Sequence, residues 1–173
     1  MEVSCKLFAP ESYDSAPDDR SMKARTSNLV RLGHSAVHGK GVFARRAIRK
    51  GARIIEYTGE RILWEKAQRL APHDPTNPYH TFFFALDDGM VINAGSGGNE
   101  SRWINHSCEP NCEPRDYRGG IYIYALRNLK KGEELFYDYN LEPAGRRTKK
   151  LERLFACHCG AAHCRGTMLE PLD

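Results

Sequence analysis

The sequence contains no long hydrophobic run. None of its apolar stretches approaches the roughly 20 consecutive residues that a membrane-spanning helix needs. The first twenty residues, which include several Asp and Pro, also have none of the apolar segment of a secretory signal. We therefore expect an intracellular protein that does not use a membrane as a partner.

A strong excess of one charge is also absent. The 26 Lys and Arg residues face 22 Asp and Glu residues, which gives a net charge of +4 without the arginine stripe of a typical nucleic-acid reader. The basic residues do gather locally, at 45–53 and 146–150. A solvated face and a tail explain these clusters best, and a nucleic-acid contact is the alternative.

Internal repeats and compositional extremes are missing as well. A chain of 173 residues with 40% hydrophobic and 28% charged residues has the profile of a single folded domain. Its six cysteines, in a reducing compartment, indicate metal binding or chemistry before disulfides.

The residue pattern predicts a mainly β body. From residue 28 onward, short apolar runs alternate with glycines, and aromatic or β-branched runs at 81–86, 90–92 and 121–126 are typical of strands. Helical spacing appears at 61–71 and 147–155. Residues 1–27 read as an irregular arm, and the long polar stretch between Asn93 and Gly120 as a functional connection.

Three cysteines gather near the end of the sequence. Cys157, Cys159 and Cys164 have C-x-C-x4-C spacing, and the side chains of the first two point to opposite sides of an extended chain, which disfavours a disulfide between them. A structural zinc ion needs four ligands. The pattern therefore predicts a metal site with one ligand from a distant segment.

Four motifs in order, together with this tail, resemble the SET-domain protein lysine methyltransferases. The motifs are His38–Phe43, Glu56–Glu60, the run Arg102–Asn111 that contains Asn-His-Ser-Cys, and Glu134–Tyr139. The resemblance covers most of residues 28–166. It implies a β-clip-like fold of several small sheets with short helices and a C-terminal pseudoknot, which would bring the segments of Asn105 and Tyr139 side by side. It also divides the chain into an arm (1–27), a SET domain (28–142) and a zinc-bound post-SET tail (143–173).

In the resembling family, the cysteine of the Asn-His-Ser-Cys motif supplies the fourth thiolate. That residue is Cys108, so the expected zinc ligands are Cys108, Cys157, Cys159 and Cys164. His158 and His163 are rival ligands by chemistry, although four thiolates already complete a zinc shell. Cys5 and Cys112 are expected to be ordinary thiols.

The resemblance also implies an S-adenosylmethionine site. Glycines let the backbone approach a bulky polar ligand, and amide and main-chain groups can pair with an adenine edge. The expected cofactor-binding residues are His38, Lys40, Gly41, Phe43, Tyr57, Arg102, Asn105, His106 and Tyr139. A polar turn that satisfies its own backbone is the alternative interpretation of Asn105 and His106.

Tyr139 and Tyr137 match the family's catalytic positions. The Tyr139 hydroxyl is expected beside the reacting methyl group and a neutral lysine amine, while Tyr137 is expected to limit the product to mono- or dimethyllysine. The sequence departs from many relatives at Phe82, where they carry a tyrosine that holds the lysine. This departure bears on product specificity.

The resemblance predicts a protein-lysine methyltransferase that acts on a histone tail or another basic protein. One rival function is a catalytically weak module that uses the groove for peptide recognition. The second is a zinc-stabilised protein that contacts nucleic acid through its basic clusters.

Overall fold

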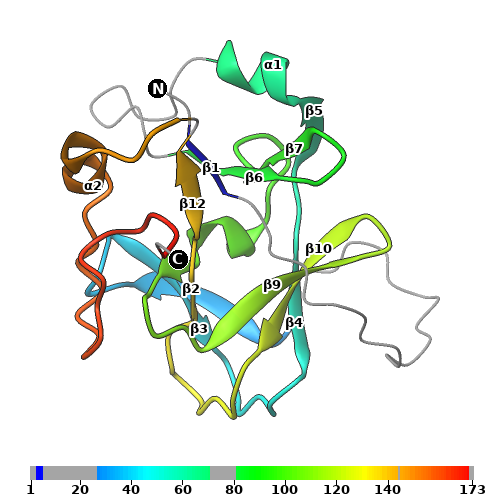
Figure 1. The fold of residues 1–173 in the computed structure, drawn as a ribbon. Coiled ribbons are helices and arrows are strands. Elements are labelled where there is room, and N and C mark those ends of the chain that lie inside the picture. The colour runs from blue at the N-terminus through cyan, green and yellow to red at the C-terminus, as the bar shows by residue number, and fades with distance from the viewer. Residues whose placement is uncertain (1–2, 6–26, 71–80, 144, 172–173) are drawn as a thin grey trace.

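The computed structural model describes residues 3–5, 27–70, 81–143 and 145–171 (Figure 1). The elements in chain order are β1 (Val3–Cys5), β2 (Val30–His34), β3 (Lys40–Ala44), β4 (Arg53–Tyr57), β5 (Glu60–Leu63), α1 (Trp64–Gln68), β6 (Phe83–Ala85), β7 (Met90–Asn93), the 3-10 helix η1 (Glu100–Trp103), β8 (Asn105–His106), β9 (Cys112–Tyr117), β10 (Gly120–Ala125), β11 (Phe136–Tyr137), β12 (Leu141–Pro143) and α2 (Lys149–Leu154). The prediction of a mainly β fold of small sheets and short helices is confirmed.

The strands of the described residues form five small sheets. Two have three strands, in the orders β4-β10-β9 and β5-β7-β6, and three are pairs, β1-β12, β2-β3 and β11-β8. Strand β10 shows why a sheet forms here, since Ile121, Ile123 and Ala125 are buried while the alternate residues remain partly exposed. The buried side chains join one main hydrophobic core that also takes residues from β3, β4 and β7.

One pair joins segments that are distant in sequence. Strands β8 and β11 run parallel, with Asn105 opposite Phe136 and His106 opposite Tyr137. This pairing places the Asn-His motif beside the Tyr-Asp-Tyr motif, as the resemblance predicts.

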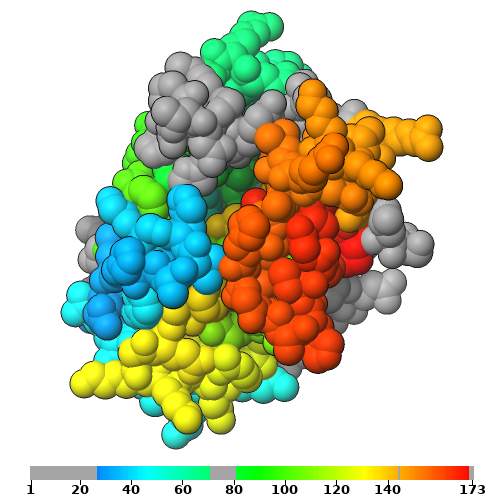
Figure 2. All heavy atoms as spheres, turned by 90° about the vertical axis from the view of Figure 1, so that its left-hand side faces the viewer, coloured from blue at the N-terminus to red at the C-terminus, as the bar shows by residue number. Residues whose placement is uncertain are grey.

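The tail has its own small core. Leu151, Phe155 and Leu169 are buried together, and Leu141 packs against them. A bridge from Leu141 to Leu169 ties the tail to β12. The tail thus lies against the body (Figure 1, Figure 2).

The structure differs from the sequence predictions in three places. The helix expected over 61–71 is shorter, because its first residues pair as β5 with β7; Ala71 lies outside the described residues. The stretch 93–120 contains η1, β8 and β9 and is not one long connection. Within the arm expected to be irregular, Val3–Cys5 pair with β12, and most of the rest lies outside the described residues.

No helix in the described part of the chain is long and apolar enough to cross a membrane. The intracellular location stays a prediction.

Candidate active site and metal centre

The four cysteines expected to bind metal lie together. The sulfurs of Cys108, Cys157, Cys159 and Cys164 are all within 4.8 Å of one another, and Cys108 Sγ is 3.7 Å from Cys157 Sγ and 3.9 Å from Cys164 Sγ. A tetrahedral zinc ion with bonds of about 2.3 Å to sulfur separates its ligands by about 3.8 Å. The spacing and the donor set therefore fit zinc.

The rival histidine ligands lie outside this group. The His163 ring is 90% exposed, and its Nδ1 lies 2.6 Å from Glu109 Oε1. His158 is exposed. Cys112 is buried and makes a sulfur contact with the Phe136 carbonyl, as an ordinary thiol does.

The thiols differ in acidity. Burial raises the pKa of Cys108 and that of Cys157. Burial also acts to raise the pKa of Cys159, but hydrogen bonds from backbone groups and neighbouring thiols outweigh it and lower that pKa to about 6. One thiolate is therefore available at neutral pH to start metal binding.

His106 connects the thiol cluster to Tyr139. Its Nδ1 accepts a hydrogen bond from the Tyr139 backbone N–H at 3.1 Å, so Nε2 carries the proton and donates to Cys108 Sγ at 3.4 Å. Burial lowers the pKa of His106 to about 4, despite the nearby Asp138 carboxylate. The neutral imidazole thus joins the segment of Tyr139 to the thiol cluster.

The two tyrosines lie next to each other. Their ring centroids are 5.0 Å apart, and the Tyr139 ring also meets His106 edge-on at 5.3 Å. The Tyr139 hydroxyl donates to the Ile104 carbonyl at 2.8 Å. Tyr137 is buried, whereas Tyr139 is only partly buried.

Asn105 links the glycine turn to the segment that precedes β11. Its Nδ2 donates to the Lys40 carbonyl at 2.9 Å and to Glu134 Oε1 at 3.2 Å. A Cβ on Gly41 would lie 2.2 Å from Glu134 Oε1, so a larger residue there would require the flexible Glu134 side chain to move away from Asn105. Glu134 was not among the predicted site residues, although it begins one of the motifs.

Cations and aromatic rings gather beside this turn. Lys40 Nζ lies 4.5 Å from the centre of the Trp103 ring, and the Arg102 guanidinium lies 5.1 Å from the same ring. Phe82 meets Trp103 edge-on at 4.9 Å. Among the described residues, the buried Nε of Arg102 has no hydrogen-bond partner, while Nη1 donates to the Ala94 carbonyl.

Three of the predicted cofactor-binding residues lie outside this group of cations and rings. Tyr57 is a core residue whose hydroxyl donates to the Phe82 carbonyl at 3.3 Å. Phe43 is partly buried beneath Arg31. The His38 side chain is exposed, and its carbonyl accepts a long hydrogen bond of 3.5 Å from Asn105.

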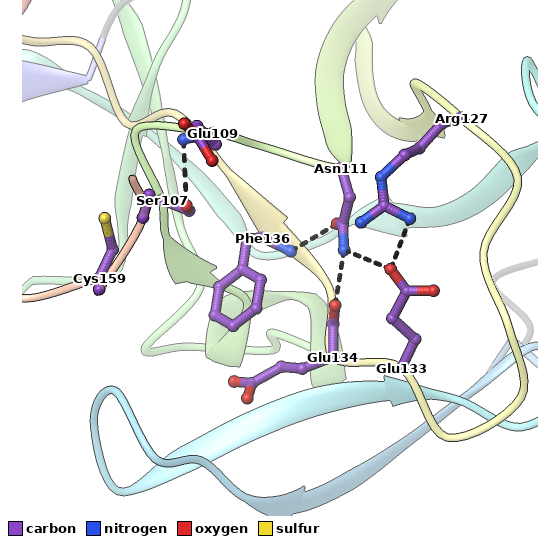
Figure 3. Close-up of a pocket in the computed structure, with 10 residues that line it drawn as sticks. Ser107, Glu109, Asn111, Arg127, Glu133, Glu134, Phe136 and Cys159 are labelled. Atoms are coloured by element: carbon purple, nitrogen blue, oxygen red, sulfur yellow. Dashed lines mark hydrogen bonds and ion pairs between the residues drawn. The ribbon is translucent and has the colours of Figure 1, made fainter. Parts of the chain in front are cut away.

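An open hollow of about 270 Å³ lies between the body and the tail (Figure 3). Its lining combines residues after the Asn-His motif with others near β11 and in the tail: Ser107, Glu109, Asn111, Arg127, Glu133, Glu134, Phe136, Cys159, Gly160 and Ala161. Buried Asn111 braces it, because its amide donates to the Glu134 carbonyl at 2.7 Å and accepts from the Phe136 N–H at 2.9 Å. Glu134 joins the hollow to the glycine turn.

Two further residues connect the tail to the Tyr-Asp-Tyr motif, which begins at the end of β11. Arg165 makes a bidentate ion pair with Asp138, with distances of 2.6 Å and 2.8 Å. Asp138 lies between the two tyrosines in sequence, so that motif did point to it, but no local pattern singled out Arg165.

Comparison with known proteins gives consistent matches. The human histone-lysine N-methyltransferase 2B is 38% identical over 84% of this chain and 5% of its own length. The Drosophila melanogaster histone-lysine N-methyltransferase trr is 35% identical over 96% of this chain and 7% of its own. The Saccharomyces cerevisiae histone-lysine N-methyltransferase, H3 lysine-4 specific, is 38% identical over 79% of this chain and 13% of its own. The chain therefore spans only a small part of the curated relatives it matches.

A solved structure has the same fold. A humanized mutant of the Chaetomium thermophilum Polycomb Repressive Complex 2, bound to the inhibitor GSK126, matches with a TM-score of 0.55 and 33% identity over 66% of this chain and 15% of that one. The SET-domain family model matches residues 39–140, more than half of the chain. This chain belongs to the SET-domain family.

Proposed function

We propose that this chain is the catalytic domain of a histone-lysine N-methyltransferase and that it uses S-adenosylmethionine. The observation that carries the proposal is the parallel pairing of β8 with β11, which sets Tyr139 against the Asn-His segment. The names of the matched relatives bring histones as substrates, and that of the Saccharomyces cerevisiae relative specifies H3 lysine 4. Histone H3 lysine 4 is therefore the first substrate to test.

The residues around the glycine turn fit the cofactor. S-adenosylmethionine carries a carboxylate, and the cations of Lys40 and Arg102 beside Trp103 provide complementary charge. The unpartnered Nε of Arg102 is a donor that such a ligand would satisfy. When bound, the cofactor supplies an electrophilic methyl group on a sulfonium centre.

The remaining proposed cofactor contacts are the ones expected from sequence. His38, Gly41, Phe43 and Tyr57 would contribute the wall around the turn. Asn105, His106 and Tyr139 would contribute the strand that faces it. The core position of Tyr57 makes it a support for this wall more than a direct contact.

Tyr139 has the role of orienting the reacting groups. Its hydroxyl already lies on the Ile104 carbonyl, which fixes the phenol in one direction. A lysine amine attacks only when neutral, and an apolar surrounding lowers its proton affinity. The lysine ammonium must therefore lose one proton to solvent before the attack, and in-line positioning then supplies much of the rate. The cofactor would leave as a neutral thioether, and the product would be a methylammonium.

The thiol cluster has the role of holding the tail. Cys108, Cys157, Cys159 and Cys164 would bind one Zn²⁺, whose closed shell makes it structural and not catalytic. Through His106, the same site would brace the strand that carries Tyr139.

The decisive experiment uses labelled S-adenosylmethionine with the purified chain. Wild-type protein and the Tyr139→Phe variant are incubated with core histones, and mass spectrometry locates the labelled residue. We expect transfer to a histone lysine by the wild type and a loss of about 100-fold or more in the variant, which lacks one orienting hydroxyl.

Cofactor binding, measured by calorimetry, should change little in Tyr139→Phe. Equal transfer by both proteins would remove Tyr139 from the mechanism. Labelling of other basic proteins in a cell extract but not of histones would keep the activity and change the substrate.

A further inference from the structure

The fold joins two basic loops that are far apart in sequence. The first loop, residues 45–50, connects β3 and β4, and the second, residues 127–133, follows β10. Ile48 and Leu129 form an antiparallel bridge, with reciprocal backbone hydrogen bonds of 3.0 Å and 2.8 Å. The two loops lie side by side at one end of the molecule (Figure 1).

These loops carry much of the positive charge of the chain. Their cations are Arg45, Arg46, Arg49, Lys50, Arg127, Lys130 and Lys131, and their only acid is Glu133. Seven cations and one anion give +6, while the whole chain has +4, so the remainder of the chain has a net charge of −2. All seven cations are exposed.

Most of this charge has no partner among the described residues. Arg127 pairs with Glu133 at 2.6 Å, and Arg45 donates to the Val30 carbonyl at 2.6 Å. No ion pair involving Arg46, Arg49, Lys50, Lys130 or Lys131 occurs in the described part of the chain. The charge therefore faces solvent and is available to a ligand.

The loops are held rigidly. Lys50 N–H donates to Asn128 Oδ1 at 2.9 Å, Gly51 N–H to the Ala125 carbonyl at 2.8 Å, and Gly132 N–H to the Ala44 carbonyl at 2.8 Å. Such a preorganised surface loses little conformational freedom when it binds.

The same loops present neither rings nor large apolar side chains to solvent. Ile48 and Leu129 are 4% and 2% exposed, and the other residues of the two loops are charged, small or polar. Single-stranded nucleic acids need stacking platforms, and amphipathic membrane-surface helices insert an apolar face, so neither of these binding modes fits. A rigid cationic surface suits regularly spaced phosphates, as a duplex displays them.

We infer that the loops 45–50 and 127–133 form a docking surface for the phosphate backbone of double-stranded DNA. The contact would be independent of sequence, because no base-reading element accompanies it. The basic residues at 146–150 lie on the tail and are not part of this surface. The cations near Leu129 are part of it, although the sequence pattern did not group them with those at 45–53. The inferred docking needs no methyltransfer and so stands apart from the proposed function.

The test compares two triple variants of the zinc-loaded chain without cofactor. The surface variant is Arg49→Gln/Lys130→Gln/Lys131→Gln, and the matched control, Arg146→Gln/Lys149→Gln/Lys150→Gln, removes the same charge from exposed positions on the tail. Binding to a labelled 20-base-pair duplex is followed by fluorescence anisotropy over a series of salt concentrations.

We expect the surface variant to lose about tenfold or more in affinity and its log–log salt slope to become shallower by about 2 to 3, since each neutralised phosphate contributes about 0.9. In the control, the decrease in the logarithm of the affinity should be less than a third of the decrease in the surface variant. If the triple variant unfolds, the double variant Lys130→Gln/Lys131→Gln provides the same comparison with a slope change of about 2.

Several results would overturn the inference. Equal losses in the two triple variants would show that overall charge and not this surface binds DNA. Equal or tighter binding to a single strand of the same sequence would show that the ligand is not a duplex. Competition by poly-glutamate at the same charge concentration as duplex would indicate an acidic protein as the partner.

Discussion

At the scale of single residues, Tyr137 occupies a confined position. It is only 6% exposed, and its ring centroid lies 5.0 Å from that of Tyr139. A phenol hydroxyl in so tight a place occupies volume and binds polar groups, including water. We therefore propose that it restricts how many methyl groups fit on an amine that Tyr139 would orient.

Removing this hydroxyl should change the product. In the Tyr137→Phe variant the ring still fills its site, and the space near the amine becomes larger and less polar, so we expect a shift from mono- and dimethyllysine toward trimethyllysine. Mass spectra of a histone peptide at equal turnover measure the distribution. Tyr124→Phe, on the partly exposed face of β10, is the control and should leave it unchanged. The same distribution in all three proteins would contradict the role of Tyr137.

Phe82 stands where many relatives carry a lysine-holding tyrosine. It is buried against Trp103 at 4.9 Å and its ring offers no hydrogen bond. The ring is thus part of the hydrophobic core as well as a neighbour of the proposed cofactor residues. A lysine held here would rely on shape and on Tyr137 and Tyr139.

At the scale of elements, the tail and β11 are joined by the Asp138–Arg165 ion pair. Its two short bonds form a planar fork, and the side chains are only 19% and 24% exposed. Charge-assisted bidentate pairs with little solvent access are stronger than surface pairs. This contact fixes how the tail lies against the tyrosines.

Breaking this pair should destabilise the protein. Arg165→Gln removes two charged hydrogen bonds and leaves Asp138 without its cation, which costs about 2 kcal/mol. In a chain of this size we expect the melting temperature of the zinc-loaded protein to fall by about 6 °C. Calorimetry of the variant measures the change.

Two companion variants sharpen this result. Arg165→Lys keeps the charge but not the fork, so its loss should be intermediate. Arg153→Gln changes an exposed arginine of α2 and should alter the melting temperature by less than 1 °C, within the usual range for surface substitutions. If Arg165→Gln behaves like Arg153→Gln, the ion pair contributes nothing to the attachment of the tail.

Elements also show how far the sequence alone could lead. The alternating pattern of β10 and the spacing of Cys157, Cys159 and Cys164 carried direct physical information, so the strand and the thiol group were predictable. The N-terminal part of the helix expected over 61–71 instead forms β5, because pairing with β7 overrides a local helical pattern.

Contacts across the chain were less accessible. The resemblance predicted that Cys108 joins the tail thiols and that the two motifs meet, but no local rule predicts the fork of Arg165 on Asp138. Glu134 against Gly41 and the bridge between Ile48 and Leu129 are also long-range contacts. Such contacts depend on the final packing and not on periodicity.

At the scale of the whole molecule, the body and the tail differ in how they are stabilised. The body has a hydrophobic core that extends over most of its strands, whereas the described part of the tail buries only Leu151, Phe155 and Leu169 in its own cluster. So small a cluster does not offset the entropy of ordering the tail. We propose that a metal joining Cys108 to the three tail thiols supplies the missing stability.

Metal removal should therefore unfold the tail selectively. We expect about one zinc per chain in the purified protein, and a chelator should release it. Hydrogen exchange should then accelerate over residues 149–171 while β4, β9 and β10 stay protected, because their hydrogen bonds do not depend on the thiols. Adding zinc back should restore both slow exchange and methyltransfer.

Substitution at single thiols separates the metal from the sulfur itself. Cys159→Ser removes one ligand and should reproduce the effect of the chelator, with fast exchange in the tail and a weakly held metal. Cys112→Ser alters a buried thiol outside the cluster, and its zinc content should stay at one equivalent, so any loss of stability it shows cannot come from the metal. If the tail of the metal-free wild-type chain exchanged as slowly as that of the zinc-loaded chain, packing alone would hold the tail. A metal between Cys108 and the three tail thiols would then not be needed for its order.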